Sequence, residues 1–526
     1  RRLAAKFYPM TDGSGDRARL FGSGLGTSPD DVDVQFLDTT LRDGEQAPGI
    51  SLTPAEKARI ARALDRAAID VIEAGSACTG PGERETISRV TELNLDATVT
   101  SFARGVQNDI DLALECDVDG INLVVPASDQ HIEDKIGTSH EDNVRSTVEL
   151  VEYAKDHDLW VEVIGEDGSR ADLDYLEELM GASLEAGADR VCYADTVGHA
   201  TPDRTFEAVS RLAALGPTST HTHDDLGLAV TNVMASLSAG ADLVHGTING
   251  IGERAGNVAL EEVAIALDHG YGIETMDLEQ VYDLAQLIAS ATGIPLAPNK
   301  AVVGENAFTH ESGIHTDGTL KDESMYEPYP PEKVGRERRL ALGKHAGRAG
   351  VRAALDEHDI SVEADDLAEI VARVKELGER GKRVTDADLL TIAEEVQGRE
   401  RERRVELLEL TAVSGSSVPT ASIRLEVDGE EREEAATGTG PVDAAMQAAE
   451  AALSHTADAQ LESYHVDAIT GGHDAIVTVE VEMSRGDDYV TVSASEADIT
   501  RASVEAMVDA MDRLVANDPD TVIADD

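Results

Sequence analysis

Short apolar runs and amphipathic stretches alternate along the first half of the chain. The run VQFLDTTLRD (34–43) predicts a strand that ends in polar residues, and TPAEKARIARALDRAAI (53–69) predicts a helix with Thr53 as its N-cap and Pro54 as its first residue. The alternation continues to LVHGTING (243–250). About eight strand–helix units over roughly 250 residues predict an α/β fold, the (β/α)8 TIM barrel. A doubly wound open sheet is the alternative, weakened because no GxGxxG follows the first strand.

The second half follows a different pattern. After Ile294 comes a linker-like stretch, followed by segments that predict helices around 365–381 and 386–396. From Val405 apolar residues recur at every second position, which predicts a small α+β domain that ends in a helix. The charge run EEREE (430–434) is interpreted as a solvated turn. The predicted parts are a flexible N-terminal tail (1–33), a catalytic barrel (34–290), helical linker subdomains (291–400) and a C-terminal domain (401–526).

The charge balance is strongly acidic. The 103 Asp and Glu residues stand against 44 Lys and Arg, which gives a formal net charge of -59. The acids are spread along the chain, and we interpret them as the solvated coat of a halophilic protein, since salt in the cytoplasm screens the self-repulsion. Nucleic-acid binding is disfavoured because it needs clustered cations. With 41% hydrophobic residues, the chain still has enough apolar side chains for a large core.

The cysteines and apolar runs exclude several classes of protein. Cys78, Cys116 and Cys192 are too few and too scattered for a disulfide framework or a thiolate zinc site. No apolar run approaches the ~20 residues that span a membrane. The opening stretch through Pro29 is polar and Gly-rich and lacks the apolar region of a signal peptide. We expect a cytoplasmic protein with no membrane partner.

Polar side chains gather where the predicted barrel strands end. They are Asp38, Arg42, Asp43, Glu166, Thr196, His221, His223 and the loop from Asn249 to Asn257. The C-terminal ends of the strands form the active face of a barrel. We therefore expect the chemistry of this protein among these residues.

The sharpest local signal is the segment His221-Thr222-His223. Residues two apart on a strand point to the same face, so both imidazoles are expected to project into the barrel mouth, where they could hold a divalent metal. An isolated pair of this kind is more often two ordinary histidines. Here Asp43 can add a carboxylate and Asn257 a carbonyl oxygen, a ligand set that suits Mg, Mn or Zn. Such a metal would bind a 2-oxo acid and polarise its carbonyl group.

Two further residues have both a catalytic and a structural interpretation. Arg42, beside Asp43, could neutralise a developing alkoxide, or it could form a structural ion pair at the strand end. Glu166 could orient water or an acetyl group, or it could be a solvated loop acid. The Gly-rich segment NGIGERAGN (249–257) could form a backbone cradle near a ligand, but alone it is a weak turn signal.

Four long motifs resemble one enzyme family in the family's own order. They are FLDTTLRDGEQAPG (36–49), HTHDDLGLAVTN (221–232), INGIGERAGN (248–257) and GENAFTHESGIHTDG (304–318). They are similar to the acetyl-CoA-dependent 2-isopropylmalate, citramalate and homocitrate synthases of the DRE-TIM metallolyase group. The resemblance runs from about Val34 to near Leu514. It implies a Claisen-type condensation of acetyl-CoA with a small 2-oxo acid.

The resemblance also implies roles for individual residues. The implied metal ligands are Asp43, His221, His223 and Asn257. Arg42 would stabilise the keto oxygen, Gln46 would lie near acetyl-CoA, and Glu166 and Thr196 match substrate-pocket positions. His315 and Tyr326 match linker residues that reach the partner subunit's active site, which implies a domain-swapped homodimer. For the general base, a water-linked Glu166 and the His315–Tyr326 pair both remain open.

The last ~120 residues resemble the family's regulatory domain, to which a branched-chain amino acid binds as an inhibitor. The matching segments are VSGSSVPTAS (413–422), GTGPVDAAMQA (438–448) and AITGGHDAI (468–476). We therefore expect an allosteric, amino-acid-binding C-terminal domain.

Within the family, several segments look closest to archaeal (R)-citramalate synthases, among them IEAGSACTGPGERE (72–85) and INLVVPASDQH (121–131). Pyruvate is therefore the expected 2-oxo acid, in isoleucine biosynthesis, and 2-oxoisovalerate in leucine biosynthesis is the alternative. Asn122, Ile164 and Asp224 depart from the usual family pattern, which bears on this choice more than on the reaction. A metal-dependent aldol lyase and a non-catalytic amino-acid sensor are the remaining rivals.

Overall fold

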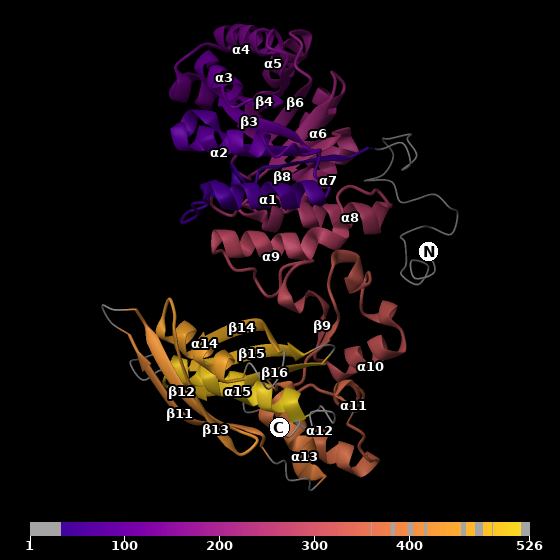
Figure 1. Cartoon of the computed structure of the whole chain (residues 1–526). Coiled ribbons are helices and arrows are strands. Elements are labelled where there is room, and N and C mark those ends of the chain that lie inside the picture. The colour runs from indigo at the N-terminus through magenta and orange to yellow at the C-terminus, as the bar shows by residue number, and fades with distance from the viewer. Residues whose placement is uncertain are drawn as a thin grey trace. The chain divides into compact units, whose positions relative to one another are not determined.

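The protein is described by a computed structural model over residues 33–358, 360–379, 384–397, 403–414, 418–453, 459–468, 477–485 and 488–516. It divides into two compact units (Figure 1). The first unit runs to Phe308 and takes in Glu327–Arg338, and the second comprises Thr309–Tyr326 and the chain from Arg339 onward. The units do not divide at residue 290 or 400, so the domain bounds given above stay predictions. The expected tail lies outside the described residues, apart from its last residue.

Eight parallel strands form a closed barrel in the first unit. They are β1 (Gln35–Asp38), β2 (Val71–Ser76), β3 (Thr98–Arg104), β4 (Gly120–Pro126), β5 (Trp160–Glu166), β6 (Arg190–Asp195), β7 (Thr218–Thr222) and β8 (Leu243–Gly246). The first strand closes the ring, because Leu37 pairs with Val71 of β2 on one side and with His245 of β8 on the other. The TIM-barrel prediction is confirmed.

The crossover helices lie around the strands. They are α1 (Pro54–Arg66), α2 (Pro81–Thr91), α3 (Gln107–Leu114), α4 (His140–Lys155), α5 (Leu173–Glu185), α6 (Pro202–Ala213), α7 (Ala229–Ala239) and α8 (Leu260–Tyr271), with α9 (Val281–Thr292) following. Helix α1 begins as the sequence predicts: Thr53 accepts a hydrogen bond from Glu56 N, and the Glu56 carboxylate accepts one from Thr53 N. This capping box fixes the start of α1.

The inside of the barrel is polar above a small apolar floor. Leu37, Val71 and Leu243 form that floor, and the last two are the first residues of their strands. Higher up, Glu73 of β2 accepts a hydrogen bond from Asn122 of β4, a contact that only the barrel interior allows. Hydrogen bonds of this kind between interior side chains can orient a site at the strands' C-terminal ends.

The second unit begins with short linker elements. They are β9 (Thr309–His310), α10 (Gly313–Lys321), β10 (Arg339–Leu340), α11 (Arg348–Glu357), α12 (Ala364–Glu379) and α13 (Asp386–Val396). Val351, Ile370, Val374 and Leu389 are fully buried in the core that these helices share. The two helices predicted around 365–381 and 386–396 are confirmed as α12 and α13.

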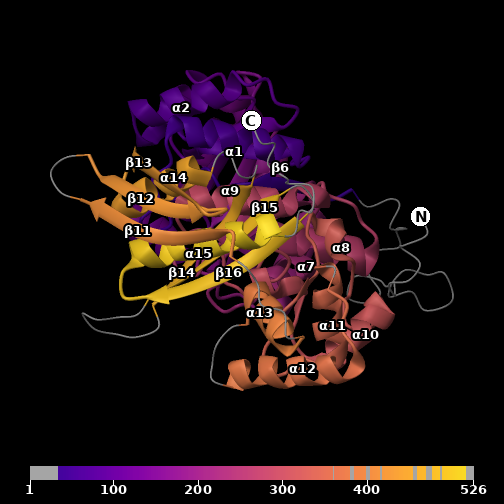
Figure 2. The same ribbon diagram turned by 60° about the horizontal axis from the view of Figure 1, so that its bottom comes forward.

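Two three-stranded antiparallel sheets follow in the same unit. The first contains β11 (Val405–Val413), β12 (Thr420–Val427) and β13 (Glu430–Thr437), and the second β14 (Gln460–Ala468), β15 (Val477–Arg485) and β16 (Asp488–Glu496). Helices α14 (Pro441–Leu453) and α15 (Ile499–Ala516) cover the apolar faces of the sheets (Figure 2). Ile423 and Leu425 point to these helices and are buried, as the period of two predicts.

The run EEREE was predicted to be a turn, and this is wrong: it begins strand β13. The turn lies just before it, at Asp428 and Gly429, whose φ angles are 52° and 82°. Val427 pairs with Glu430 across this two-residue loop, which is the geometry of a type I′ hairpin. The charged side chains stay mostly exposed, so their solvation was predicted correctly.

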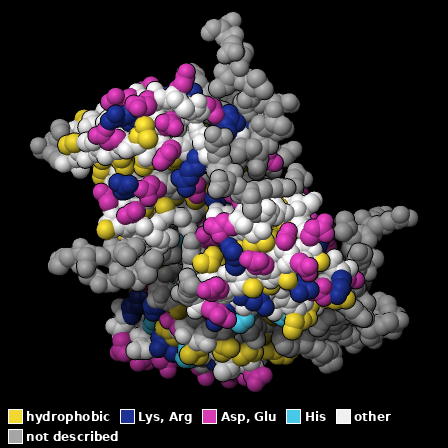
Figure 3. All heavy atoms as spheres, turned by 90° about the horizontal axis from the view of Figure 1, so that it is seen from below, with side chains coloured by type: hydrophobic (Ala, Val, Ile, Leu, Met, Phe, Trp, Pro, Cys, Tyr) yellow, Lys and Arg dark blue, Asp and Glu magenta, His cyan; other side chains and the backbone are white. Residues whose placement is uncertain are grey.

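Acidic side chains are scattered over the visible described surface, with Lys and Arg between them (Figure 3). No helix among the described residues is both long and apolar enough to cross a bilayer. The described part of the C-terminal domain includes GTGPVDAAMQA but omits most of AITGGHDAI and residues 415–417, so these parts of the regulatory match lie outside the structure.

Candidate metal centre and active site

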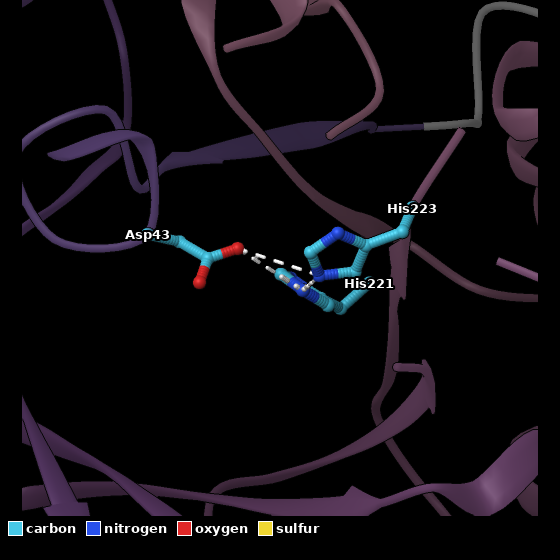
Figure 4. A group of neighbouring side chains, drawn as sticks. All are labelled: Asp43, His221 and His223. Carbon is cyan, nitrogen blue, oxygen red and sulfur yellow. Dashed lines mark hydrogen bonds and ion pairs between the residues drawn. The ribbon is translucent and has the colours of Figure 1, made fainter. Parts of the chain in front are cut away.

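Asp43, His221 and His223 converge at the C-terminal end of the barrel (Figure 4). Asp43 lies in the turn after β1, His221 is near the end of β7, and His223 follows one residue after that strand. The two Nε2 atoms are 3.2 Å apart, and Asp43 Oδ2 lies 3.7 Å from His221 Nε2 and 3.5 Å from His223 Nε2. All three residues are buried. The prediction that residues 221 and 223 point to one face therefore agrees with the geometry.

These distances fit a metal ion. Ligand atoms about 2.1 Å from one divalent ion, at tetrahedral or octahedral angles, stand roughly 3.0–3.5 Å apart. The three separations between the ligand atoms, 3.2, 3.5 and 3.7 Å, are close to that spacing. His223 Nδ1 is buried and has no hydrogen-bond partner among the described residues, so the ring is held mainly through its Nε2 side. The donor set contains nitrogen and oxygen without thiolate, which suits Mg, Mn or Zn.

The protonation states also suit a metal. Burial lowers the pKa of His221 well below its usual 6.5, and the neighbouring His223 lowers it further. Burial lowers the pKa of His223 as well. Burial alone would raise the pKa of Asp43, but the Arg42 guanidinium and the two imidazoles outweigh it and the net pKa is low. The site thus presents two neutral imidazoles and one carboxylate, the forms that bind metal.

Asn257 meets this triad through its amide nitrogen. Nδ2 donates to Asp43 Oδ2 at 2.8 Å and to the Ile251 carbonyl at 3.1 Å, while Oδ1 is buried without a partner among the described residues. A bridge between the backbones of His223 and Asn257 brings the two loops together. In this orientation Asn257 positions Asp43, and its predicted role as a metal ligand stays a prediction.

Arg42 lies between Asp43 and a glutamate that sequence analysis did not single out. Its Nη1 donates to Asp43 Oδ1 at 2.8 Å and its Nε donates to Glu73 Oε2 at 2.7 Å. The guanidinium also lies over the Phe102 ring, 4.7 Å from the centroid. Glu73 is buried and also accepts a hydrogen bond from Asn122 at 2.8 Å. The sequence does contain a signal for Glu73, because this acidic residue lies inside the apolar run VIEAG. A strand buries an acidic side chain only when that side chain has partners.

The other predicted pocket residues, Gln46, Thr196 and Glu166, differ in their exposure and in their contacts. Gln46 is exposed at the end of a short 3-10 helix (Gly44–Gln46), and Thr196 accepts a hydrogen bond from Asp167 N at 2.8 Å. Glu166 is ion-paired: Lys135 Nζ lies 2.6 and 2.8 Å from its two oxygens, and His131 Nδ1 lies 3.2 Å from Oε2. These contacts hold the Glu166 side chain beside two residues of the loop after β4.

His315 and Tyr326 lie together in the second compact unit. Their rings stack, with centroids 4.2 Å apart and an interplanar angle of 25°. Both side chains are exposed, and so is the neighbouring Ile314 of α10. The structure therefore brings this pair together, and its predicted role in a partner's active site stays a prediction.

Three family models match consecutive parts of the chain. The model described as HMGL-like matches residues 33–288, the homocitrate synthase post-HMGL domain-like model matches 302–382, and the LeuA allosteric (dimerisation) domain model matches 383–515. The (R)-citramalate synthase of Methanocaldococcus jannaschii is 46% identical over 488 residues, which cover 92% of this chain and 99% of that protein. The chain belongs to the (R)-citramalate synthase family.

One further relative agrees with this assignment. A protein of Methanothermobacter thermautotrophicus, provisionally named an (R)-citramalate synthase, is 51% identical over 490 residues, which cover 93% of this chain and 99% of that protein. Among solved structures, the hydroxymethylglutaryl-CoA lyase of Pseudomonas aeruginosa covers 50% of this chain and 94% of its own, with 24% identity and a TM-score of 0.45.

This (R)-citramalate synthase family member contains a second buried group of potential ligands, deeper in the barrel. Glu162, Cys192 and His245 have ligand atoms within 4.8 Å of one another. Glu162 Oε2 lies 2.9 Å from His245 Nε2, and Ser219 Oγ donates to Glu162 Oε1 at 2.5 Å. Burial alone would raise the pKa of Glu162, but His245 and the Ser219 hydroxyl outweigh it and the net pKa is lowered. Sequence analysis missed this group, whose signal is again an acid inside an apolar strand, WVEVIGE.

Proposed function

We propose that the chain condenses acetyl-CoA with pyruvate to give (R)-citramalate and free CoA, in isoleucine biosynthesis. The observation that supports this best is the convergence of Asp43 Oδ2 with the Nε2 atoms of His221 and His223, beside Arg42. The named relatives support the choice of product. An aldol lyase is less well supported, because the chain continues into regions matched by the post-HMGL and LeuA models. A silent sensor is disfavoured because Asp43, His221, His223 and Asn257 are all present and converge.

Each residue of the centre has a definite task in this proposal. Asp43, His221 and His223 would hold a divalent metal, either Mn, Mg or Zn, with Asn257 as a fourth ligand or as the donor that orients Asp43. When bound, the metal supplies Lewis-acid polarisation of the 2-oxo group. Arg42 uses Nε and Nη1 in its contacts with Glu73 and Asp43. Its Nη2 is then left to donate to the oxygen that gains negative charge as the new carbon–carbon bond forms.

The general base must remove a proton from the methyl group of acetyl-CoA. Both carboxylate oxygens of Glu166 are engaged by Lys135 Nζ, at 2.6 and 2.8 Å, so neither oxygen is free to accept a proton from acetyl-CoA. We therefore assign the base to His315, stacked on Tyr326, acting in the active site of a partner subunit. Gln46 and Thr196 would bind substrate groups. Hydrolysis of the thioester releases free CoA and makes the condensation irreversible in practice.

The preference for pyruvate rests on a small apolar cluster in the barrel. Ile164, Cys192 and Ala194 are buried together, with Val124 packed against them. Ala194 pairs with His221 on the neighbouring strand, so the cluster adjoins the metal centre. The Ile164 side chain would fill this part of the pocket, which leaves room for a methyl group rather than an isopropyl group. One such contact discriminates by only ~1–3 kcal/mol, so 2-isopropylmalate synthase in leucine biosynthesis is the second candidate.

Regulation by a branched-chain amino acid is also proposed. A cavity of about 1000 Å³ lies beside the N-terminus of α14 in the second unit. Val442, Met446 and Leu461 offer apolar contacts for an aliphatic side chain, and Asp443 lies beside them as a partner for an ammonium group. Feedback inhibition and assembly as a homodimer fit the LeuA allosteric (dimerisation) match. The halophilic, cytoplasmic character is likewise proposed, on the acidic coat.

The proposed reaction can be tested by free-thiol release from acetyl-CoA with a panel of 2-oxo acids, in molar KCl with Mn or Mg. A strong preference for pyruvate over 2-oxoisovalerate supports citramalate synthesis. The opposite preference would still support a metal-dependent condensation, but the product would then be 2-isopropylmalate. No thiol release with any 2-oxo acid contradicts the proposed function. Full activity without added salt contradicts the halophilic assignment.

A further inference from the structure

Lys57 is a buried lysine near the start of α1 that the mechanism above does not use. Its side chain is 1% exposed. Its Nζ lies 2.9 Å from the Leu41 carbonyl oxygen, 2.7 Å from Glu45 Oε2 and 2.7 Å from Glu83 Oε1. An ammonium group has three N–H donors, so each donor meets one acceptor. The charge is therefore fully paired inside the protein.

Two of these three partners flank the pair Arg42–Asp43. Leu41 immediately precedes the pair, and Glu45 follows one residue after Gly44. The other oxygen of Glu45 accepts a hydrogen bond from Leu52 N at 2.9 Å, which closes the loop that carries Gln46. The ammonium of Lys57 thus fixes the chain on both sides of the residues that face the proposed metal and the 2-oxo acid.

The third partner, Glu83, connects Lys57 to the neighbouring strand β2. Glu83 lies on α2, which follows β2, and β2 carries Glu73, the partner of Arg42. Gly75 of the same strand has a φ of 156°, and a Cβ atom there would collide with the Glu83 carboxylate. The glycine therefore leaves the space through which Glu83 reaches Lys57. The Lys57 ammonium is therefore connected to Arg42 through the loop after β1, and to Glu73 through β2 and α2.

We propose that Lys57 is a positioning residue for the condensation, which sets the placement of Asp43 and Arg42 without touching the substrate. This inference rests on the proposed metal-dependent function. Removing the ammonium leaves two carboxylates turned toward one buried point without a cation, and their repulsion moves the β1 loop. Metal binding and turnover then fall together, because both depend on the same loop. A lysine that only stabilised the fold would lower the melting temperature without this joint effect.

The test compares Lys57→Met with a control at a less buried lysine, Lys155→Met, in the full chain. Lys155 Nζ also contacts a carbonyl and a carboxylate, Leu159 O at 2.9 Å and Asp189 Oδ2 at 2.7 Å, but beside the N-terminal ends of β5 and β6. Mn²⁺ affinity is measured by electron paramagnetic resonance, together with kcat, KM for pyruvate and the melting temperature. We expect Lys57→Met to weaken Mn²⁺ binding about 10–100-fold and to lower kcat at least about tenfold. Lys155→Met is expected to stay within about twofold of the wild type.

A folded Lys57→Met protein whose Mn²⁺ affinity and kcat match those of Lys155→Met overturns the proposal. If Lys57→Met does not fold, Glu83→Gln takes its place, since it keeps the lysine and removes one of its ion pairs. Mn²⁺ binding weakened several-fold in Glu83→Gln supports the positioning role, and unchanged binding contradicts it. A wild-type protein that binds no Mn²⁺ and releases no CoA would instead reject the function on which the inference rests.

Discussion

The barrel holds two buried groups of three potential metal ligands, and the spacing of their ligand atoms separates them. At the C-terminal end, Asp43, His221 and His223 keep their nearest ligand atoms 3.2–3.7 Å apart. Deeper inside, Glu162 and His245 are in direct contact at 2.9 Å. The two groups are neighbours, because the rings of His221 and His245 lie edge to face with centroids 5.8 Å apart. Both groups are buried and combine a carboxylate with imidazole, so they differ mainly in the distances between their ligand atoms.

That difference indicates different tasks. An ion needs a gap into which several ligand atoms point, and the group at the barrel end has this spacing. In the deeper group Glu162 Oε1 accepts a hydrogen bond from Ser219 Oγ, and Oε2 already lies 2.9 Å from His245 Nε2, which leaves no gap for an ion between these two atoms. Burial raises the pKa of Cys192 well above its usual value, and Glu162 adds to this, so the thiol stays neutral. A neutral thiol is a poor metal ligand.

The largest expected effect comes from removing a ligand of the outer group. His223→Ala deletes one of the two Nε2 atoms and leaves Asp43 and one imidazole. We expect kcat with pyruvate to fall at least about a thousandfold, which is ~4 kcal/mol in the barrier, because the 2-oxo group loses its Lewis acid. Steady-state CoA release and Mn²⁺ titration measure both effects. Activity within tenfold of the wild type would show that His223 is not a required metal ligand.

The next effect comes from breaking the deeper pair. Glu162→Gln removes the charge that faces His245, and we expect a loss of about 2 kcal/mol in the free energy of unfolding with one Mn²⁺ still bound per chain. Because the folded pKa of Glu162 is lowered, its contribution is present above the unfolded pKa of about 4.3 and is lost as the pH falls through the folded pKa. Urea unfolding at neutral and acidic pH should show the wild type and the variant converging in acid. Loss of the bound Mn²⁺ would mean that the deeper group contributes to the metal site.

A smaller effect is expected for the third member of the deeper group. Cys192→Ser replaces a neutral thiol with a hydroxyl of similar shape, so the free energy of unfolding should fall by less than about 1.5 kcal/mol. Metal content by mass spectrometry should be unchanged. A drop in bound metal would show that the Cys192 sulfur is a ligand after all.

The smallest change is expected in the pH dependence of the outer group. The pKa values of His221 and His223 are lowered below 6.5, chiefly by burial. Protons therefore compete with the metal only below that pH, and we expect Mn²⁺ affinity to change less than about twofold between pH 8 and about 6.5. A tenfold fall over this range would show that the imidazoles titrate like exposed ones.

Local patterns predicted most of the fold and the convergence of the outer group of potential ligands. The alternation of strands and helices, the Thr53 cap and the period of two in His221-Thr222-His223 all depend on neighbouring residues, so sequence alone was enough. Glu73, Glu162 and Lys57 were missed because their partners come from distant strands and helices. EEREE was assigned to a turn because its charge suggested solvent, although Asp428 and Gly429 are the residues that supply the positive φ angles. The ion pair of Glu166 with Lys135 could not be predicted either, since 31 residues separate the two.

The central claim is that one metal ion binds between Asp43, His221 and His223 and that none binds at Glu162, Cys192 and His245. Anomalous diffraction from crystals soaked with Mn²⁺, recorded near the manganese absorption edge, tests it directly. The account predicts a single strong peak in the barrel, about 2.1 Å from Asp43 Oδ2 and from both Nε2 atoms. A peak beside His245 and Cys192, or no peak at the barrel end in protein that turns over pyruvate, would contradict it.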